Sequence, residues 1–129
     1  VGDPMKHLLL LLLFVGLPGL ASARAWQCTN DIEVSCAAQK CTASESFTPT
    51  SISLQETGRM EICAYSGCWR GRGTVTKSKG AVYFSAPKLK WSGVEKGEAR
   101  AIVALDTLDR LALVKVAGFA MPVHCKKGS

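Results

Sequence analysis

The chain has 129 residues, of which 47% are hydrophobic and 20% charged, and its 16 Lys and Arg residues outnumber its 10 Asp and Glu residues to give a net charge of +6. This balance supports one small, basic, globular domain, because the apolar fraction is large enough to offset the chain entropy lost on folding. Collagen-like, coiled-coil and acidic disordered chains are excluded by the same numbers.

The N-terminal segment has the layout of an export signal. Lys6 precedes an apolar run over residues 8–15, and small residues follow it. The run is well short of the roughly 20 apolar residues that cross a bilayer, so we predict a cleaved signal peptide and not a membrane anchor. Cleavage after Ala23 or Ala25 fits the small-residue pattern, and Ala25 is preferred because it places Trp26 at the head of the first strand.

This interpretation divides the chain into two parts. Residues 1–25 are an N-terminal extension followed by the signal peptide, and residues 26–129 are a single exported β-domain. We expect the domain to be periplasmic or secreted, monomeric, and without a membrane span after processing.

The first strand patterns of the domain lie before residue 65. Apolar and polar residues alternate over residues 26–36, which predicts a half-buried strand whose two cysteines face the core. Residues 37–46 read as a polar loop. Residues 50–55 and 59–64 then make a hairpin around a Gly-containing turn.

Further short strands are predicted down to the C-terminal region. Residues 68–77 form a strand in which two internal glycines indicate a bulge or a sharp coil. Residues 81–85 form the next strand, Ala86-Pro87 breaks it, and residues 88–92 alternate again.

The last part of the chain continues the pattern with residues 98–105, 111–117 and 119–125. The stretch 99–113 is rich in Ala and Leu and is also compatible with a helix. Short segments separated by turn residues every eight to twelve positions are typical of an all-β antiparallel meander. We predict that this meander closes as a barrel, with a β-sandwich as the alternative.

Cysteine parity predicts three disulfides in an exported domain of this size. The six cysteines are Cys28, Cys36, Cys41, Cys63, Cys68 and Cys125. Cys36–Cys41 and Cys63–Cys68 can each close a local loop, which leaves Cys28 for Cys125; the chief alternative exchanges the short pairs, for example Cys41 with Cys63. No Cys-x-x-Cys occurs, so we expect neither a metal site nor a thioredoxin-like redox site.

The sequence lacks a recognisable catalytic constellation. His124 is the one histidine of residues 26–129, and no Gly-x-Ser-x-Gly motif accompanies it, which argues against a serine triad. We therefore predict a binding or inhibitory module with no catalytic residue and no cofactor. The alternative is a glycan-active enzyme of the cell envelope that uses two carboxylates. Its candidates are Glu56, Glu61, Glu95 and Glu98.

A basic segment carries the functional prediction. Residues 62–94 contain no acidic residue but hold Arg70, Arg72, Lys77, Lys79, Lys88 and Lys90. Strand alternation places Arg70 and Arg72 together on one face, and Lys88 and Lys90 likewise oppose Trp91. The cations either only solvate a sheet face or bind an anionic partner. That partner is an envelope polymer, an acidic cleft of another protein or a nucleic acid, and export makes nucleic acid the least favoured.

The segments Gly80-Ala-Val-Tyr83, Trp91 and Lys96-Gly-Glu-Ala99 resemble a motif of the periplasmic and membrane-bound inhibitors of c-type lysozyme. The resemblance implies a small disulfide-bridged eight-stranded barrel, similar to a miniature lipocalin. It also implies a plug in which a serine and a lysine enter the lysozyme cleft and meet its catalytic carboxylates. Lys96 matches the family lysine, whereas Lys79 stands where the serine is expected.

Overall fold

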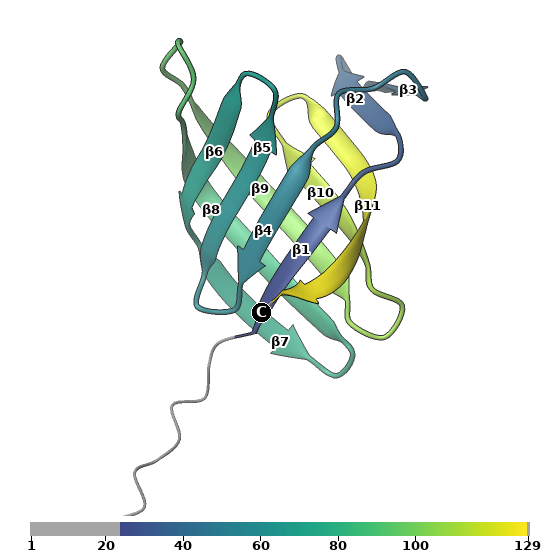
Figure 1. Cartoon of the computed structure of the whole chain (residues 1–129), viewed down its shortest axis with the longest axis vertical. Coiled ribbons are helices and arrows are strands. Elements are labelled where there is room, and N and C mark those ends of the chain that lie inside the picture. The colour runs from purple at the N-terminus through teal and green to yellow at the C-terminus, as the bar shows by residue number, and fades with distance from the viewer. Residues whose placement is uncertain (1–23, 129) are drawn as a thin grey trace, which may run out of the picture.

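The computed structural model describes residues 24–128, which form a closed antiparallel barrel without helix (Figure 1). Its strands are β1 (Ala25–Thr29), β2 (Glu33–Ala37), β3 (Lys40–Ser44), β4 (Ser51–Gln55), β5 (Arg59–Ala64), β6 (Gly67–Arg72), β7 (Thr74–Ser78), β8 (Ala81–Trp91), β9 (Glu98–Asp106), β10 (Leu111–Val116) and β11 (Phe119–Gly128). The all-β barrel prediction is confirmed, and the sandwich alternative is wrong.

Eight strands close the barrel in the order β1, β4, β5, β6, β8, β9, β10 and β11, and β11 pairs back onto β1. The β2–β3 hairpin extends the sheet beyond β11, and β7 pairs with the first half of β8. In Figure 1 the upper end carries this hairpin, the β5–β6 turn and the β8–β9 loop, while β7 lies at the lower end. The two ends of the barrel are therefore different surfaces.

Alternation along the strands fills the barrel with apolar side chains. The largest buried ones include Trp26, Ile52, Leu54, Met60, Phe84, Leu89, Val103 and Leu105. A barrel of eight strands has an interior that side chains can fill. The core is thus a packed interior, and the remaining side chains of each strand face outward.

The three disulfides have the predicted pairing. Cys28–Cys125 joins register partners on β1 and β11 and so spans the closing seam of the barrel. Cys36–Cys41 closes the β2–β3 hairpin, and Cys63–Cys68 closes the β5–β6 turn. The exchanged pairing is wrong, because each of the two short pairs closes on itself. Three disulfides indicate folding in an oxidising compartment outside the cytoplasm.

The predicted first strand is wrong in its length, because Asn30 interrupts it. The Asn30 side chain is 6% exposed, accepts a hydrogen bond from Thr50 N at 2.8 Å and donates one to Ile32 O at 3.3 Å. This break directs the chain out of the barrel into β2. As a result Cys36 is half-buried outside the core, and the expected loop over residues 37–46 contains β3.

The predicted break at Ala86-Pro87 is also wrong, because β8 continues through it with a β-bulge between Ala86 and Leu89. The interruption falls at Gly73 instead, between β6 and β7, within the segment whose glycines indicated irregularity. A Cβ on Gly73 would collide with the carbonyl oxygen of Ser85. Residues 99–113 form strands and a turn, so their helical alternative is wrong.

The predicted signal peptide covers residues that lie almost entirely outside residues 24–128. The first described residues belong to the barrel: Ala25 opens β1 opposite Gln55 and Gly128, one residue before the expected start at Trp26. The carbonyl oxygen of Arg24 accepts a hydrogen bond from Glu56 N at 2.9 Å. No helix of the described residues is long and apolar enough to cross a membrane.

Candidate functional site

Basic side chains gather on the outer surface of four adjacent strands, β5, β6, β8 and β9. The inward positions of these strands, such as Met60 and Leu89, are buried, so the alternating positions face outward. The exposed cations at these positions are Arg59, Arg70, Arg72, Lys88, Lys90 and Arg100. We call these six residues the basic face.

Strand pairing aligns these cations across the sheet. Arg59 on β5 is the register partner of Arg72 on β6. Arg70 on β6 is the partner of Lys90 on β8. Because β6 and β8 are antiparallel, a step of two residues forward from Arg70 corresponds to a step of two residues back from Lys90. Arg72 therefore lies opposite Lys88.

The β-bulge in β8 extends this alignment to β9. Ala86 and Leu89 keep inward positions paired with β9, so two residues between them, Pro87 and Lys88, face the single outward residue Arg100. A bulge tolerates the proline, which lacks an N–H for the ladder. One line of cations therefore crosses four strands. We call Arg59, Arg72, Lys88 and Arg100 the cation row.

The neighbouring line across the same strands is partly neutralised. Arg70 Nε lies 2.6 Å from Glu61 Oε2 in an exposed ion pair. Lys90 is the register partner of Glu98 on β9. The line thus reads Glu61, Arg70, Lys90, Glu98, with an acid at each end.

The cation row has no such compensation. Within residues 24–128, none of its four side chains has a carboxylate oxygen within 4.0 Å. Strands about 4.8 Å apart make the row roughly 15 Å long. Like charges facing each other on adjacent strands destabilise a sheet by some tenths of a kcal/mol per pair, on the order of 0.2–1. An anion that spans the row would remove that repulsion.

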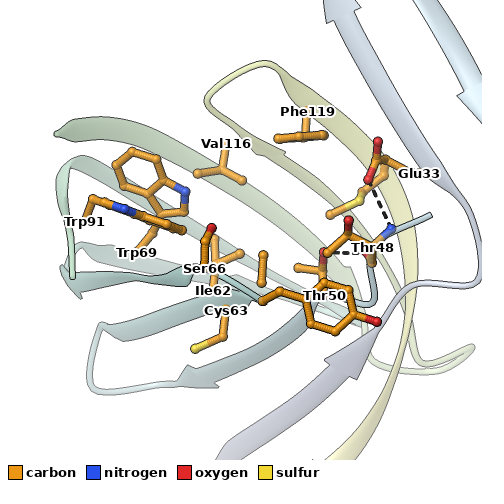
Figure 2. Close-up of a pocket in the computed structure, with 13 residues that line it drawn as sticks. Glu33, Thr48, Thr50, Ile62, Cys63, Ser66, Trp69, Trp91, Val116 and Phe119 are labelled. Carbon is orange, nitrogen blue, oxygen red and sulfur yellow. Dashed lines mark hydrogen bonds between the residues drawn. The ribbon is translucent and has the colours of Figure 1, made fainter. Parts of the chain in front are cut away.

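Trp91 belongs to a different surface from the cations. Trp69 and Trp91 are register partners on the inner side of β6 and β8, with ring centroids 4.8 Å apart and an interplanar angle of 50°. Figure 2 shows both rings at the mouth of the barrel. Trp69 and Trp91 therefore lie on the opposite side of these strands from Arg70 and Lys90 and do not form a mixed stacking platform with them.

Three other lysines that the sequence analysis singled out lie away from the basic face. Lys79 is in the turn between β7 and β8, whereas Lys96 is in the β8–β9 loop. The eleven residues of β8, a length of about 35 Å, separate these two lysines. Lys77 Nζ pairs with Glu56 Oε2 at 3.1 Å. The structure does not bring Lys79 and Lys96 together.

The candidate carboxylates are dispersed. Glu56 has a buried side chain that pairs with Lys77 near the lower end, and Glu61 pairs with Arg70. Glu61 and Glu98 are separated by three strand spacings, about 14 Å, which exceeds the separation that glycosidases use. Glu95 is in the exposed β8–β9 loop.

His124 has polar neighbours, but the arrangement differs from a catalytic triad. Its Nε2 atom lies 3.1 Å from Asp31 Oδ1 and 3.3 Å from Thr29 Oγ1. In a triad the acid and the nucleophile contact opposite ring nitrogens. Because both groups approach the same exposed nitrogen, this cluster cannot relay a proton between them.

Sequence reasoning missed Arg59 and Arg100 as members of the site. Both lie outside the acid-free segment that drew attention to the other cations, and each is close in sequence to a glutamate. Their outward orientation follows from strand alternation, but their alignment with Arg72 and Lys88 depends on strand order and on the bulge.

Family models, curated proteins and solved structures were compared with the chain, and none of them matches it. The resemblance to lysozyme inhibitors therefore stays a prediction.

Proposed function

We propose that this protein is an exported binding module that holds an anionic polymer of the cell envelope on its basic face. The observation that carries the proposal is the cation row, four uncompensated charges in one line across β5, β6, β8 and β9. A linear polyanion laid across the strands would meet a cation about every 4.8 Å, which suits closely spaced phosphate, sulfate or carboxylate groups.

The neighbouring line leaves the net charge of the face on the cation row. Six cations and two carboxylates leave the face with a local charge of 6 − 2 = +4. Glu61 and Glu98 balance Arg70 and Lys90, so the +4 resides on the four side chains of the cation row. Long-range attraction of this kind raises association rates and weakens with salt.

The proposed compartment is the periplasm or the cell exterior. Its support is the set of three disulfides together with the basic, apolar and small-residue order of the N-terminal segment. An envelope polymer is available there, whereas nucleic acid is not a regular component.

The test compares two quadruple variants with the same loss of charge. In the first, Arg59, Arg72, Lys88 and Arg100 are changed to Gln; in the second, the control, Lys40, Lys115, Lys126 and Lys127 are changed to Gln. All eight side chains are exposed. We expect the first variant to elute from immobilised heparin, and to release lipopolysaccharide, at clearly lower salt than the control. Equal elution of both variants would show that net charge alone drives binding and would overturn the proposal.

A second candidate function is inhibition of lysozyme through the β8–β9 loop. That loop projects beyond the barrel in Figure 1, and it carries the exposed Lys96 and a Val94 that is 103% exposed. A projecting loop can enter a cleft without distortion of the barrel. On this account Lys96→Ala loses inhibition of c-type lysozyme, whereas the cation-row variant keeps it. Retained inhibition by Lys96→Ala, or none by the native protein, removes this candidate.

A further inference from the structure

A cavity of about 280 Å³ opens at the upper end of the barrel, on the inner side of the wall that carries the basic face. Figure 2 shows Trp69 and Trp91 at one side of it and Glu33 with Thr48 at the other. Ile62, Val116 and Met121 supply aliphatic and thioether surface between them. The cavity thus has an aromatic side and a polar side.

The polar side carries one negative charge. Glu33 is the charged residue of the lining, and it is half-buried. Its Oε2 atom accepts a hydrogen bond from Thr48 N at 3.4 Å, and no Lys, Arg or His nitrogen of residues 24–128 lies within 4.0 Å of its carboxylate. A partly desolvated carboxylate without a counter-ion is a favourable partner for a ligand cation.

The walls of the cavity are held in place independently of a ligand. Asn30 accepts from Thr50 N at 2.8 Å and its amide group approaches Met121 Sδ at 3.7 Å, which fixes the polar side. On the aromatic side, Gly67 and Gly93 lie so close to the Trp91 ring that neither position has room for a Cβ. Small-molecule sites are usually preformed in this way.

We propose that this cavity binds a small organic ammonium compound, with its apolar or aromatic body against Trp69 and Trp91 and its charged nitrogen at Glu33. A dry cavity of about 150 Å³ holds benzene, so the observed volume suits a body of about ten non-hydrogen atoms. The tryptophan rings supply apolar surface for the body of the ligand, and the carboxylate supplies the charge opposite to its nitrogen. The site is independent of the proposed polymer-binding face, which requires the opposite charge in its ligand.

The experiment titrates three probes of similar shape into the full domain: 2-phenylethylamine, 2-phenylethanol and phenylacetate. Indole N–H resonances of Trp69 and Trp91, assigned with single Trp→Phe variants, report occupancy by NMR. We expect the amine to shift these two resonances, to leave that of the core residue Trp26 unmoved, and to bind at least about tenfold more tightly than the alcohol. Phenylacetate should bind most weakly.

Glu33→Gln tests the role of charge, because the amide oxygen can still accept from Thr48 N. This variant should bind the amine and the alcohol equally, while Asp109→Asn, which removes an exposed charge in the β9–β10 turn, should keep the tenfold preference. Trp91→Ala should weaken both probes. The proposal is overturned if the alcohol or phenylacetate binds as tightly as the amine in the native protein, if no probe moves the two indole resonances, or if Glu33→Gln leaves the preference unchanged.

Discussion

Asn30 shows how one buried polar residue organises the upper end of the barrel. Its side-chain oxygen Oδ1 accepts a hydrogen bond from Thr50 N at 2.8 Å, and its side-chain nitrogen Nδ2 donates one to Ile32 O at 3.3 Å. These bonds replace the strand pairing that the alternation of residues 26–36 predicts. The residue thereby ends β1, starts the departure toward β2 and positions one side of the cavity.

Asn30→Ala should therefore lower the free energy of unfolding by about 2 kcal/mol, because it leaves the partly buried Thr50 N–H and Ile32 carbonyl without their partner. Urea denaturation followed by tryptophan fluorescence measures the change. Asn30→Asp keeps an acceptor for Thr50 N but sets a buried carboxylate against the Ile32 carbonyl oxygen, so it should cost at least as much as Ala. A loss below about 0.5 kcal/mol in Asn30→Ala would show that water replaces these bonds at little cost.

Gly73 also determines local structure, because the backbone around it leaves no room for a side chain. Its N–H donates to Gly58 O at 2.9 Å, and a Cβ would collide with the Ser85 carbonyl oxygen. We expect Gly73→Ala to destabilise the barrel by about 2 kcal/mol, in the range of overpacked positions. Gly118→Ala is the matched control, since its Cβ meets only Cys36 O at 3.9 Å. Equal melting temperatures for the two variants would contradict the expected clash.

At the scale of elements, alternation explains what could be predicted. The period of two placed Arg70 and Arg72 outward and Trp91 inward, and the structure agrees. Alternation does not show which strands are neighbours, so the alignment of Arg59 with Arg72 could not be predicted from it. The pairing of cysteines was accessible because two short intervals close local turns.

The elements that were predicted wrongly depend on exceptions to local rules. Pro87 normally marks a strand break, but a bulge removes the need for its N–H and lets β8 continue. The short strand β3 is polar and exposed, so it lacks an alternating pattern, and its hairpin is closed by Cys36–Cys41. Likewise, nothing in the local pattern around Glu33 indicated that it would line a cavity.

The disulfides should differ in their contribution to stability. Cys28–Cys125 closes a loop with a sequence separation of 97, whereas Cys36–Cys41 has a separation of 5 and lies in a hairpin outside the closed barrel. On the chain-entropy account, replacing the first pair by Ala costs about 4–5 kcal/mol and the second about 2 kcal/mol. Denaturant titration of the two double variants measures this order. Equal losses would argue that effects other than loop length dominate.

For the molecule as a whole, the barrel separates two surfaces of different chemistry. The basic face lies on the outer wall formed by β5, β6, β8 and β9, and the cavity opens at the end where Trp69 and Trp91 face inward. Because the same strands carry both, a rigid closed sheet can present an anion site outside and a cation site inside without competition between them.

The barrel favours one of the two predicted cleavage positions of the predicted signal peptide. Ala25 pairs with Gln55 and Gly128, and Arg24 O accepts from Glu56 N at 2.9 Å. Cleavage after Ala23 would keep these contacts, whereas cleavage after Ala25 would remove them. We therefore expect the intact mass of the exported protein to correspond to an N-terminus at Arg24. A mass that corresponds to an N-terminus at Trp26 would show that the barrel forms without Ala25, the first residue of β1.

The most direct test of the central claim is the salt dependence of polyanion binding by the cation row. Affinity for a soluble heparin fragment is measured by titration at several salt concentrations, for the native protein and for the Arg59, Arg72, Lys88 and Arg100 to Gln variant. If each of the four cations pairs with one anionic group, the slope of log affinity against log salt should fall by about 3, taking roughly 0.7 per contact as for single-stranded polyanions. The control is the variant with Lys40, Lys115, Lys126 and Lys127 changed to Gln. An unchanged slope in the cation-row variant, together with a larger fall in slope in this control, would contradict the account.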